Sequence, residues 1–152
     1  MKLFAVFICG SLLPLLEANN STSLQLKAVI DPVVNIIRID NEDEELDVLK
    51  GPSANFSIVS NGGKGAEIVF NTAHNWRLQK SDDESKVIEY KCLVDSEELD
   101  TSSGTGTVSV AEDKFDGSRY NFKASFHVKD SDITYESGSY ADTVNISVNS
   151  LG

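Results

Sequence analysis

Residues 23–39 place the strongest constraint on how this chain can fold. The first half of the stretch alternates apolar with mostly polar side chains, which is the two-residue period of a strand with one buried face. Asp31-Pro32 then interrupts the alternation, because proline has no N–H for a sheet ladder and restricts the residue before it. A second apolar run, 33–39, follows directly. The stretch therefore predicts two strands separated by a break.

The first 18 residues predict a signal peptide. Met1-Lys2 precedes an apolar run over residues 3–16, about the length of a signal-peptide core and too short to cross a bilayer. Cleavage after Ala18 leaves Cys92 as the single cysteine, so an intrachain disulfide is not expected in the exported chain. The remainder has the size of one domain, which its hydrophobic core must stabilise.

Acidic side chains dominate the charge of the chain, whose formal net charge is −11. Such a surface repels phosphate backbones and anionic membranes, which disfavours a nucleic-acid partner. The acidic segments 41–45 and 130–136 are favoured as solvated loops over calcium sites. In the second of them, Tyr135 occupies the position where a calcium-binding loop needs glycine.

Short alternating segments separated by turn residues continue to the end of the chain. They predict strands over residues 55–60, 66–70, 86–94, 107–110, 120–128 and 144–149. The glycines of 61–65 predict a hairpin between the first two of these strands. The polar residues 79–85 and the acidic, Ser/Gly-rich residues 95–106, which end in Gly104-x-Gly106, predict connections. No window has an apolar stripe at helical spacing. The pattern predicts an all-β fold, an antiparallel β-sandwich of the immunoglobulin-like kind.

The sequence offers little for catalysis. The candidate bases His74 and His127 are expected in a polar turn and on an outward strand face, and no nucleophile motif accompanies them. Cys92 shares an apolar face with Tyr90 and is interpreted as a buried hydrophobic residue. Paired carboxylates are not excluded by counting, but the acidic residues cluster in loops. We therefore expect neither catalytic residues nor a metal or other cofactor, and a protein that is not an enzyme.

Two segments resemble pilins. Residues 24–40, Leu-Gln-Leu-Lys-Ala-Val-Ile-Asp-Pro-Val-Val-Asn-Ile-Ile-Arg-Ile-Asp, resemble the amino-terminal segment of major pilins of the alternate chaperone–usher class, the colonisation-factor and cable-pilus type. There, an alternating donor strand runs through Ala-x-Val-Asp-Pro-x-Val into the first core strand. The ending 137–148, Ser-Gly-Ser-Tyr-Ala-Asp-Thr-Val-Asn-Ile-Ser-Val, is similar to the final strand of exported bacterial pilins, including spore-coat-U-like secreted pilins, where Gly-x-Tyr-x-Asp precedes an alternating strand. High acidity and the presence of Cys92 depart from the pattern.

The resemblance implies a sandwich that is incomplete by one strand and is completed by donor-strand exchange. It divides the chain into a signal peptide (1–18), a donor strand (19–31) and a pilin β-sandwich domain (32–152), with Asp31 and Pro32 as the hinge. The inserting side chains would be Leu24, Leu26, Ala28 and Ile30. The acceptor groove would be lined by Val34, Ile36, Val144, Ile146 and Val148.

The implied function is that of a structural fimbrial subunit, polymerising head to tail into an adhesive fibre on the bacterial cell surface. A periplasmic chaperone and an outer-membrane usher would be its assembly partners, and the fibre could bind a host-surface receptor. Two alternatives stay open. One is a minor or tip adhesive subunit of the same system. The other is a self-contained secreted immunoglobulin-like binding domain, whose first strand pairs within its own chain.

Overall fold

The computed structural model describes residues 25, 27–28, 33–40, 46–62 and 64–151. The chain divides into two units, Met1–Ile30 and Asp31–Gly152. In the first unit, the described residues Gln25, Lys27 and Ala28 are exposed and lie outside regular secondary structure. Leu24, Leu26, Ile30 and the hinge residues Asp31 and Pro32 lie outside the described residues, so the donor strand and its hinge stay predictions.

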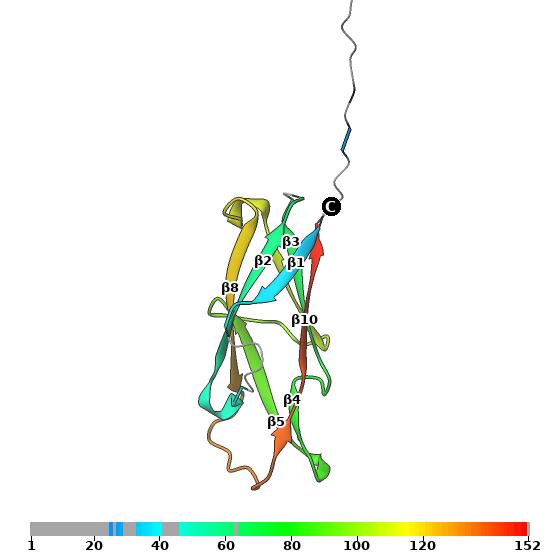
Figure 1. Cartoon of the computed structure of the whole chain (residues 1–152). Coiled ribbons are helices and arrows are strands. Elements are labelled where there is room, and N and C mark those ends of the chain that lie inside the picture. The colour runs from blue at the N-terminus through cyan, green and yellow to red at the C-terminus, as the bar shows by residue number, and fades with distance from the viewer. Residues whose placement is uncertain (1–24, 26, 29–32, 41–45, 63, 152) are drawn as a thin grey trace, which may run out of the picture. The chain divides into compact units, whose positions relative to one another are not determined.

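The second unit is built from two antiparallel sheets (Figure 1). The larger sheet has the order β1-β2-β8-β5-β4-β9, with a further short strand, β6, paired to β5. Its strands are β1 (Val34–Arg38), β2 (Ser53–Ser60), β4 (Arg77–Lys80), β5 (Asp83–Val94), β6 (Glu97–Glu98), β8 (Arg119–Val128) and β9 (Tyr140–Ala141).

The smaller sheet has the order β10-β3-β7. Its strands are β3 (Ala66–Thr72), β7 (Thr105–Val110) and β10 (Val144–Ser150). Among the described residues, helix is limited to two 3₁₀ turns, η1 (Val48–Lys50) and η2 (Glu112–Lys114). The all-β antiparallel fold predicted from the alternation is confirmed.

The core fills the space between the inner faces of the two sheets. Phe122 of β8 stacks on Phe56 of β2, with ring centroids 5.1 Å apart, and meets the edge of Phe70 from β3 at 6.4 Å. Trp76 is 3% exposed, packs against Tyr90 at 5.7 Å and donates its indole N–H to the Gly104 carbonyl. The Phe122–Phe70 contact joins the two sheets, because the alternating apolar positions of β8 and β3 face one another.

The predicted hairpin between residues 55–60 and 66–70 is wrong. β2 and β3 belong to different sheets, so the intervening turn carries the chain across the core. Gly65 does adopt the positive φ that its glycine allows, at +89°. Local glycine spacing does not distinguish a hairpin from such a crossover. The two strands bury their apolar faces against each other across the core and do not form hydrogen bonds with each other.

Two predicted connections are also partly wrong. Residues 79–85 are not a loop, because β4 pairs with β5 through a tight turn and β5 already begins at Asp83. Residues 81–85 are exposed and the polar Gln79 and Lys80 are half-buried, so no alternation of apolar and polar side chains marks this end of the hairpin. Gly104 is a turn residue with φ +86°, but Gly106 lies inside β7, where a Cβ would come within 2.2 Å of Leu99.

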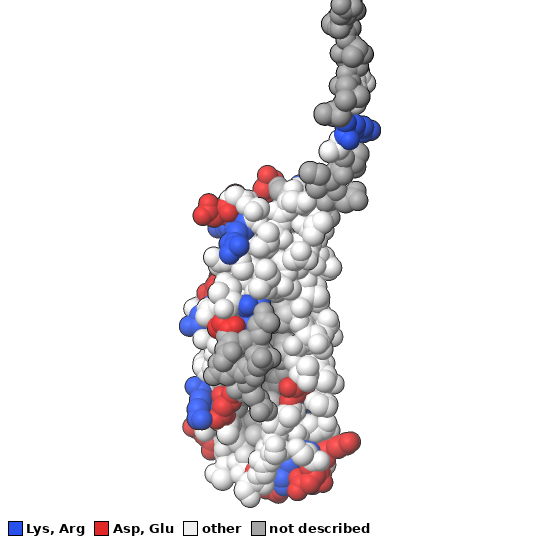
Figure 2. Space-filling model, viewed as in Figure 1, with Lys and Arg blue, Asp and Glu red and all other residues white. Residues whose placement is uncertain are grey.

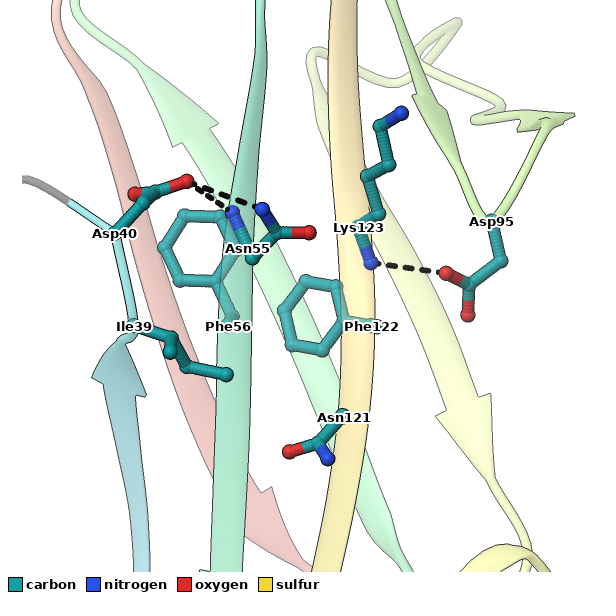
Figure 3. Close-up of a pocket in the computed structure, with 8 residues that line it drawn as sticks. All are labelled: Ile39, Asp40, Asn55, Phe56, Asp95, Asn121, Phe122 and Lys123. Carbon is teal, nitrogen blue, oxygen red and sulfur yellow. Dashed lines mark hydrogen bonds between the residues drawn. The ribbon is translucent and has the colours of Figure 1, made fainter.

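The carboxylates of Asp40 and Asp95 form hydrogen bonds between neighbouring strands of the larger sheet. Both line a shallow hollow of about 520 Å³ (Figure 3). Asp40 accepts hydrogen bonds from the backbone N–H of Asn55 at 2.7 Å and from its side-chain amide at 3.4 Å. Asp95 accepts one from the backbone N–H of Lys123 at 2.9 Å, while the Lys123 side chain points away. These bonds tie the end of β1 to β2 and the end of β5 to β8.

Candidate binding groove between the free edges of the two sheets

The first and last strands of the sandwich each have one free edge. Among the described residues, β1 pairs only with β2, and β10 pairs only with β3. β1 and β10 lie side by side, yet no ladder joins them (Figure 1). Each therefore presents unpaired backbone N–H and C=O groups along one edge, which is a template for a further strand.

A cavity of about 450 Å³ lies between the sheets beside these edges. Its wall is largely apolar and aromatic, and it includes side chains from both sheets. It is lined by Arg38, Leu46, Val48, Ala54, Phe56, Leu78, Tyr90, Phe126, Tyr140, Ala141, Asp142, Thr143, Val144 and Ile146. The surface around β10 that is visible in Figure 2 carries few charged side chains. We call this cavity the groove.

The predicted acceptor residues all occupy inward positions on β1 and β10. Each is half-buried, and each packs against the core. Val144 and Ile146 line the groove itself. Val34, Ile36 and Val148 contribute to the adjoining core but do not line the cavity.

A buried carboxylate anchors the β10 end of the groove. The Asp142 side chain is 1% exposed, and one of its oxygens accepts a hydrogen bond from the Tyr90 hydroxyl at 2.6 Å. The other accepts from the backbone N–H groups of His74 at 3.0 Å and Thr143 at 2.8 Å, with His74 Nδ1 at 3.1 Å. Burial, with the hydrogen bond to Asp142, raises the pKa of Tyr90 well above its usual range, so its hydroxyl remains a donor.

These contacts give the Gly-x-Tyr-x-Asp motif a structural account. Gly138 packs so closely on Lys80 that a Cβ would lie 2.5 Å from the lysine side chain, and its φ is +156°. Tyr140 donates its hydroxyl to the Glu136 carbonyl at 3.1 Å and lines the groove. Asp142 then joins the turn before β4, strand β5 and the start of β10. The motif therefore positions the last strand beside the groove.

A second cavity, of about 360 Å³, continues the groove beyond the start of β10. The two cavities share Leu46, Val48, Leu78 and Tyr140 in their walls. The second is completed by Asp47, Leu49, Ile88, Gly138 and Ser139. Leu49 stands at its rim with 63% of its surface exposed. We call this the end cavity.

Sequence reasoning missed several groove residues. Leu46, Val48 and Leu78 come from a loop, a single 3₁₀ turn and a four-residue strand, and segments this short show no hydrophobic period. Tyr90 and Phe126 were both predicted on buried strand faces, which is correct. Whether they line the groove depends on how the two sheets pack on each other, and the alternation within a strand does not predict that packing.

The side chains considered for catalysis, Cys92, His74 and His127, lie in separate places in the fold. Cys92 is completely buried, and burial raises the pKa of its thiol to about 12, which opposes formation of the nucleophilic thiolate. His74 pairs with Asp142, and His127 lies on the outer face of β8. In the described part of the chain, no three His, Cys, Asp or Glu side chains are grouped to hold a metal ion. Nor does any described helix have the length and apolarity to span a membrane.

Comparison with solved structures identifies the fold. One similar chain is in the CsuC–CsuE chaperone–tip adhesion subunit pre-assembly complex of archaic chaperone–usher Csu pili from Acinetobacter baumannii, with a TM-score of 0.50 and 12% identity over 78% of this chain. This chain spans only 40% of the length of that one. Another is the CooA pilin subunit of enterotoxigenic Escherichia coli, with a TM-score of 0.51 and 13% identity, over 76% of this chain and 86% of that one.

The likeness confirms an immunoglobulin-like β-sandwich of the kind found in chaperone–usher pilins. It agrees with the resemblance that residues 24–40 and the C-terminal motif carry. No protein-family model and no curated protein matches the sequence.

Proposed function

We propose that this chain is a structural fimbrial subunit that polymerises head to tail by donor-strand complementation. Residues 24–30 of one copy would lie in the groove of the next, between β1 and β10. The observation that carries the proposal is the pair of free strand edges flanking an apolar groove, in a chain whose sequence also contains an alternating segment at residues 24–30. The pilin fold of the similar structures supports the same assignment.

The length and the alternation of the donor segment support this placement. Residues 24–30 and strand β10 are both seven residues long, about 23 Å when extended. Ladder hydrogen bonds would satisfy the free edges of β1 and β10, and the apolar face of the segment would leave water. Each side chain that becomes fully buried contributes roughly 1.5–3 kcal/mol. The inserting side chains are Leu24, Leu26, Ala28 and Ile30.

The direction of the inserted strand follows from the surroundings of the groove. Every strand pair in the described sandwich is antiparallel, and antiparallel pairing to β10 places Ile30 beside Val144 and Leu24 beside Ser150. The opposite direction would bring Ile30 to the end where the recipient's own Val33 lies. Residues 24–30 and the groove are different surfaces of one chain, so the contact between copies is heterologous, and repeating it head to tail without closure into a ring generates a fibre.

A subunit with an empty apolar groove and two free edges would aggregate before assembly. A periplasmic chaperone is therefore the expected partner during export, and an outer-membrane usher is expected to catalyse the exchange of chaperone for donor strand. The assembled protein would lie on the bacterial surface as a fimbrium and contribute to adhesion. One of the similar structures is itself a chaperone–subunit complex, which supports the chaperone proposal.

Complementation in trans tests the proposal. A variant lacking residues 19–30 should fail to polymerise but should bind a synthetic peptide of residues 23–32, with a higher melting temperature once the peptide is bound. A peptide carrying Leu26→Asp should bind far more weakly, whereas Gln25→Asp, on the opposite face of the same strand, should have a small effect. Polymers formed by the deletion variant, or equal binding of both altered peptides, would contradict donor-strand complementation.

A further inference from the structure

We propose that the end cavity is a docking site for a second copy of this chain, which enters through Val33 at the beginning of β1. The inference rests on the proposed function, because it concerns the copy whose residues 24–30 fill the groove. It adds a subunit contact outside the donor strand itself. The contact would fix the angle between neighbouring subunits rather than only tether them.

Hydrogen bonds fix the Val33 backbone at one end of the sandwich. Its backbone N–H donates to the Asn61 side-chain oxygen, and its carbonyl accepts from the Asn61 N–H at 3.1 Å. Leu151 reaches the same turn, because its N–H donates to the Gly65 carbonyl at 3.3 Å. The Val33 side chain nevertheless remains 49% exposed. This end of the molecule therefore exposes an apolar side chain on a backbone that is held by hydrogen bonds.

Chain length limits where a neighbour's groove can lie. Only Asp31 and Pro32 separate Ile30 from Val33, and three Cα steps span at most about 11 Å. With Ile30 beside Val144 of the recipient, Val33 of the donor copy must lie within that distance of the start of β10. The end cavity lies on this side of the groove: Ser139 and Tyr140, which shortly precede β10 in the chain, line it, and Tyr140 lines the groove together with Val144.

The end cavity has the chemistry to receive an apolar side chain. Leu46, Val48, Leu78 and Ile88 form much of its wall, and the exposed Leu49 stands at its rim. Its acidic lining residue, Asp47, is already paired with Lys50 at 3.0 Å. The contact would thus cover two exposed large apolar side chains, Val33 from one copy and Leu49 from the other.

Disulfide trapping in polymers of the full chain tests this contact. A chain carrying both Val33→Cys and Leu49→Cys should yield a ladder of covalent multimers after mild oxidation, visible on non-reducing denaturing gels. The matched control pairs Val33→Cys with Val87→Cys, because Val87 is also an exposed apolar strand residue, at 38%, and does not line the cavity. The native Cys92 is buried and should not contribute.

The possible outcomes separate the two proposals. A ladder for the 33/49 pair, at least tenfold stronger than for the 33/87 pair, supports the contact. Polymers that form normally without the ladder, or with a cross-link only inside single chains, overturn the contact while leaving donor-strand polymerisation in place. Failure of the 23–32 peptide to bind the deletion variant overturns the proposed function itself. As a second measurement, Leu49→Ser should leave the melting of the monomer unchanged but lower the polymerised fraction several-fold at limiting protein concentration.

Discussion

Replacement of Tyr90 by phenylalanine tests whether the Asp142 contacts stabilise the groove. The substitution keeps the ring, which packs on Trp76 at 5.7 Å and on Phe126 at 6.4 Å, and removes only the hydroxyl. One oxygen of Asp142 then has no remaining protein donor among the described residues, and its side chain is 1% exposed. A hydrogen bond to a buried charged group contributes about 1.5–3 kcal/mol. We therefore expect Tyr90→Phe to lower the free energy of unfolding by about 2–3 kcal/mol.

Urea and thermal unfolding measure this loss. For a domain of this size, the change corresponds to a decrease in melting temperature of roughly 8–12 °C. Tyr120→Phe is the matched control, because its hydroxyl donates at 3.0 Å to Asp95, an exposed residue. The control should lose less than about 1 kcal/mol. Equal small losses for the two variants would refute the view that Asp142 is a buried, hydrogen-bonded anchor.

The pH dependence gives a second check on the same contact. Because burial and Asp142 raise the pKa of Tyr90 in the folded protein, the folded state retains a proton that the unfolded state releases above about pH 10. The stabilisation is fully present below that pH and decreases as the pH rises further. The difference in stability between the parent protein and Tyr90→Phe should therefore shrink in alkaline solution. A difference that is constant or grows above pH 10 contradicts the assignment.

Three further predictions concern the core and turns. Burial raises the pKa of Cys92 from 9.0 to about 12, so the thiol should resist thiol reagents until the protein is unfolded in urea. Its contribution to stability should be lost progressively between pH 9 and pH 12. Rapid labelling of the native protein would contradict this prediction. Gly65→Ala should lower the free energy of unfolding in urea far more than Gly117→Ala. Both glycines have positive φ, but only at Gly65 would a Cβ approach a backbone oxygen, at 2.4 Å. Equal losses of stability in the two variants would show that the clash is relieved. Phe122→Ala should cost about 3–5 kcal/mol, because it removes the ring stacked on Phe56, and a urea midpoint close to that of the parent would be inconsistent with this packing.

Much of the sandwich could be predicted because alternation reports directly on one-sided burial. In β8, Phe122, Ala124 and Phe126 are buried, and the residues between them face outward, as their spacing predicts. β10 shows the same pattern in a half-buried form. The Cys92 interpretation was correct for the same reason. β5 and β8 are interior strands of the larger sheet, where the inner face must be apolar.

Sheet membership and the lining of the groove could not be predicted in this way. β2 and β3 adjoin in sequence and both alternate, but β2 pairs with β1 and β8 whereas β3 pairs with β7 and β10, and nothing local excludes a hairpin between them. The β4–β5 hairpin extends beyond the core, so its exposed tip has no apolar face to detect. Asp142 belongs to a motif that the sequence shares with pilins, but the sequence alone gives no contacts for its side chain. Its role depends on Tyr90 and His74, which lie 52 and 68 residues away in sequence.

The position of β1 has a mechanical consequence for a fibre of the kind proposed. Tension transmitted through the N-terminal segment enters at Val33 and runs along the axis of β1. β1 is antiparallel to β2, and their register pairs all five residues of β1, from Val34↔Ser60 to Arg38↔Phe56. Force along the strand loads these hydrogen bonds in shear, so that they resist together rather than opening one after another. In such a fibre, β1 would therefore have two roles. It would border the groove, and it would carry the tension between neighbouring subunits.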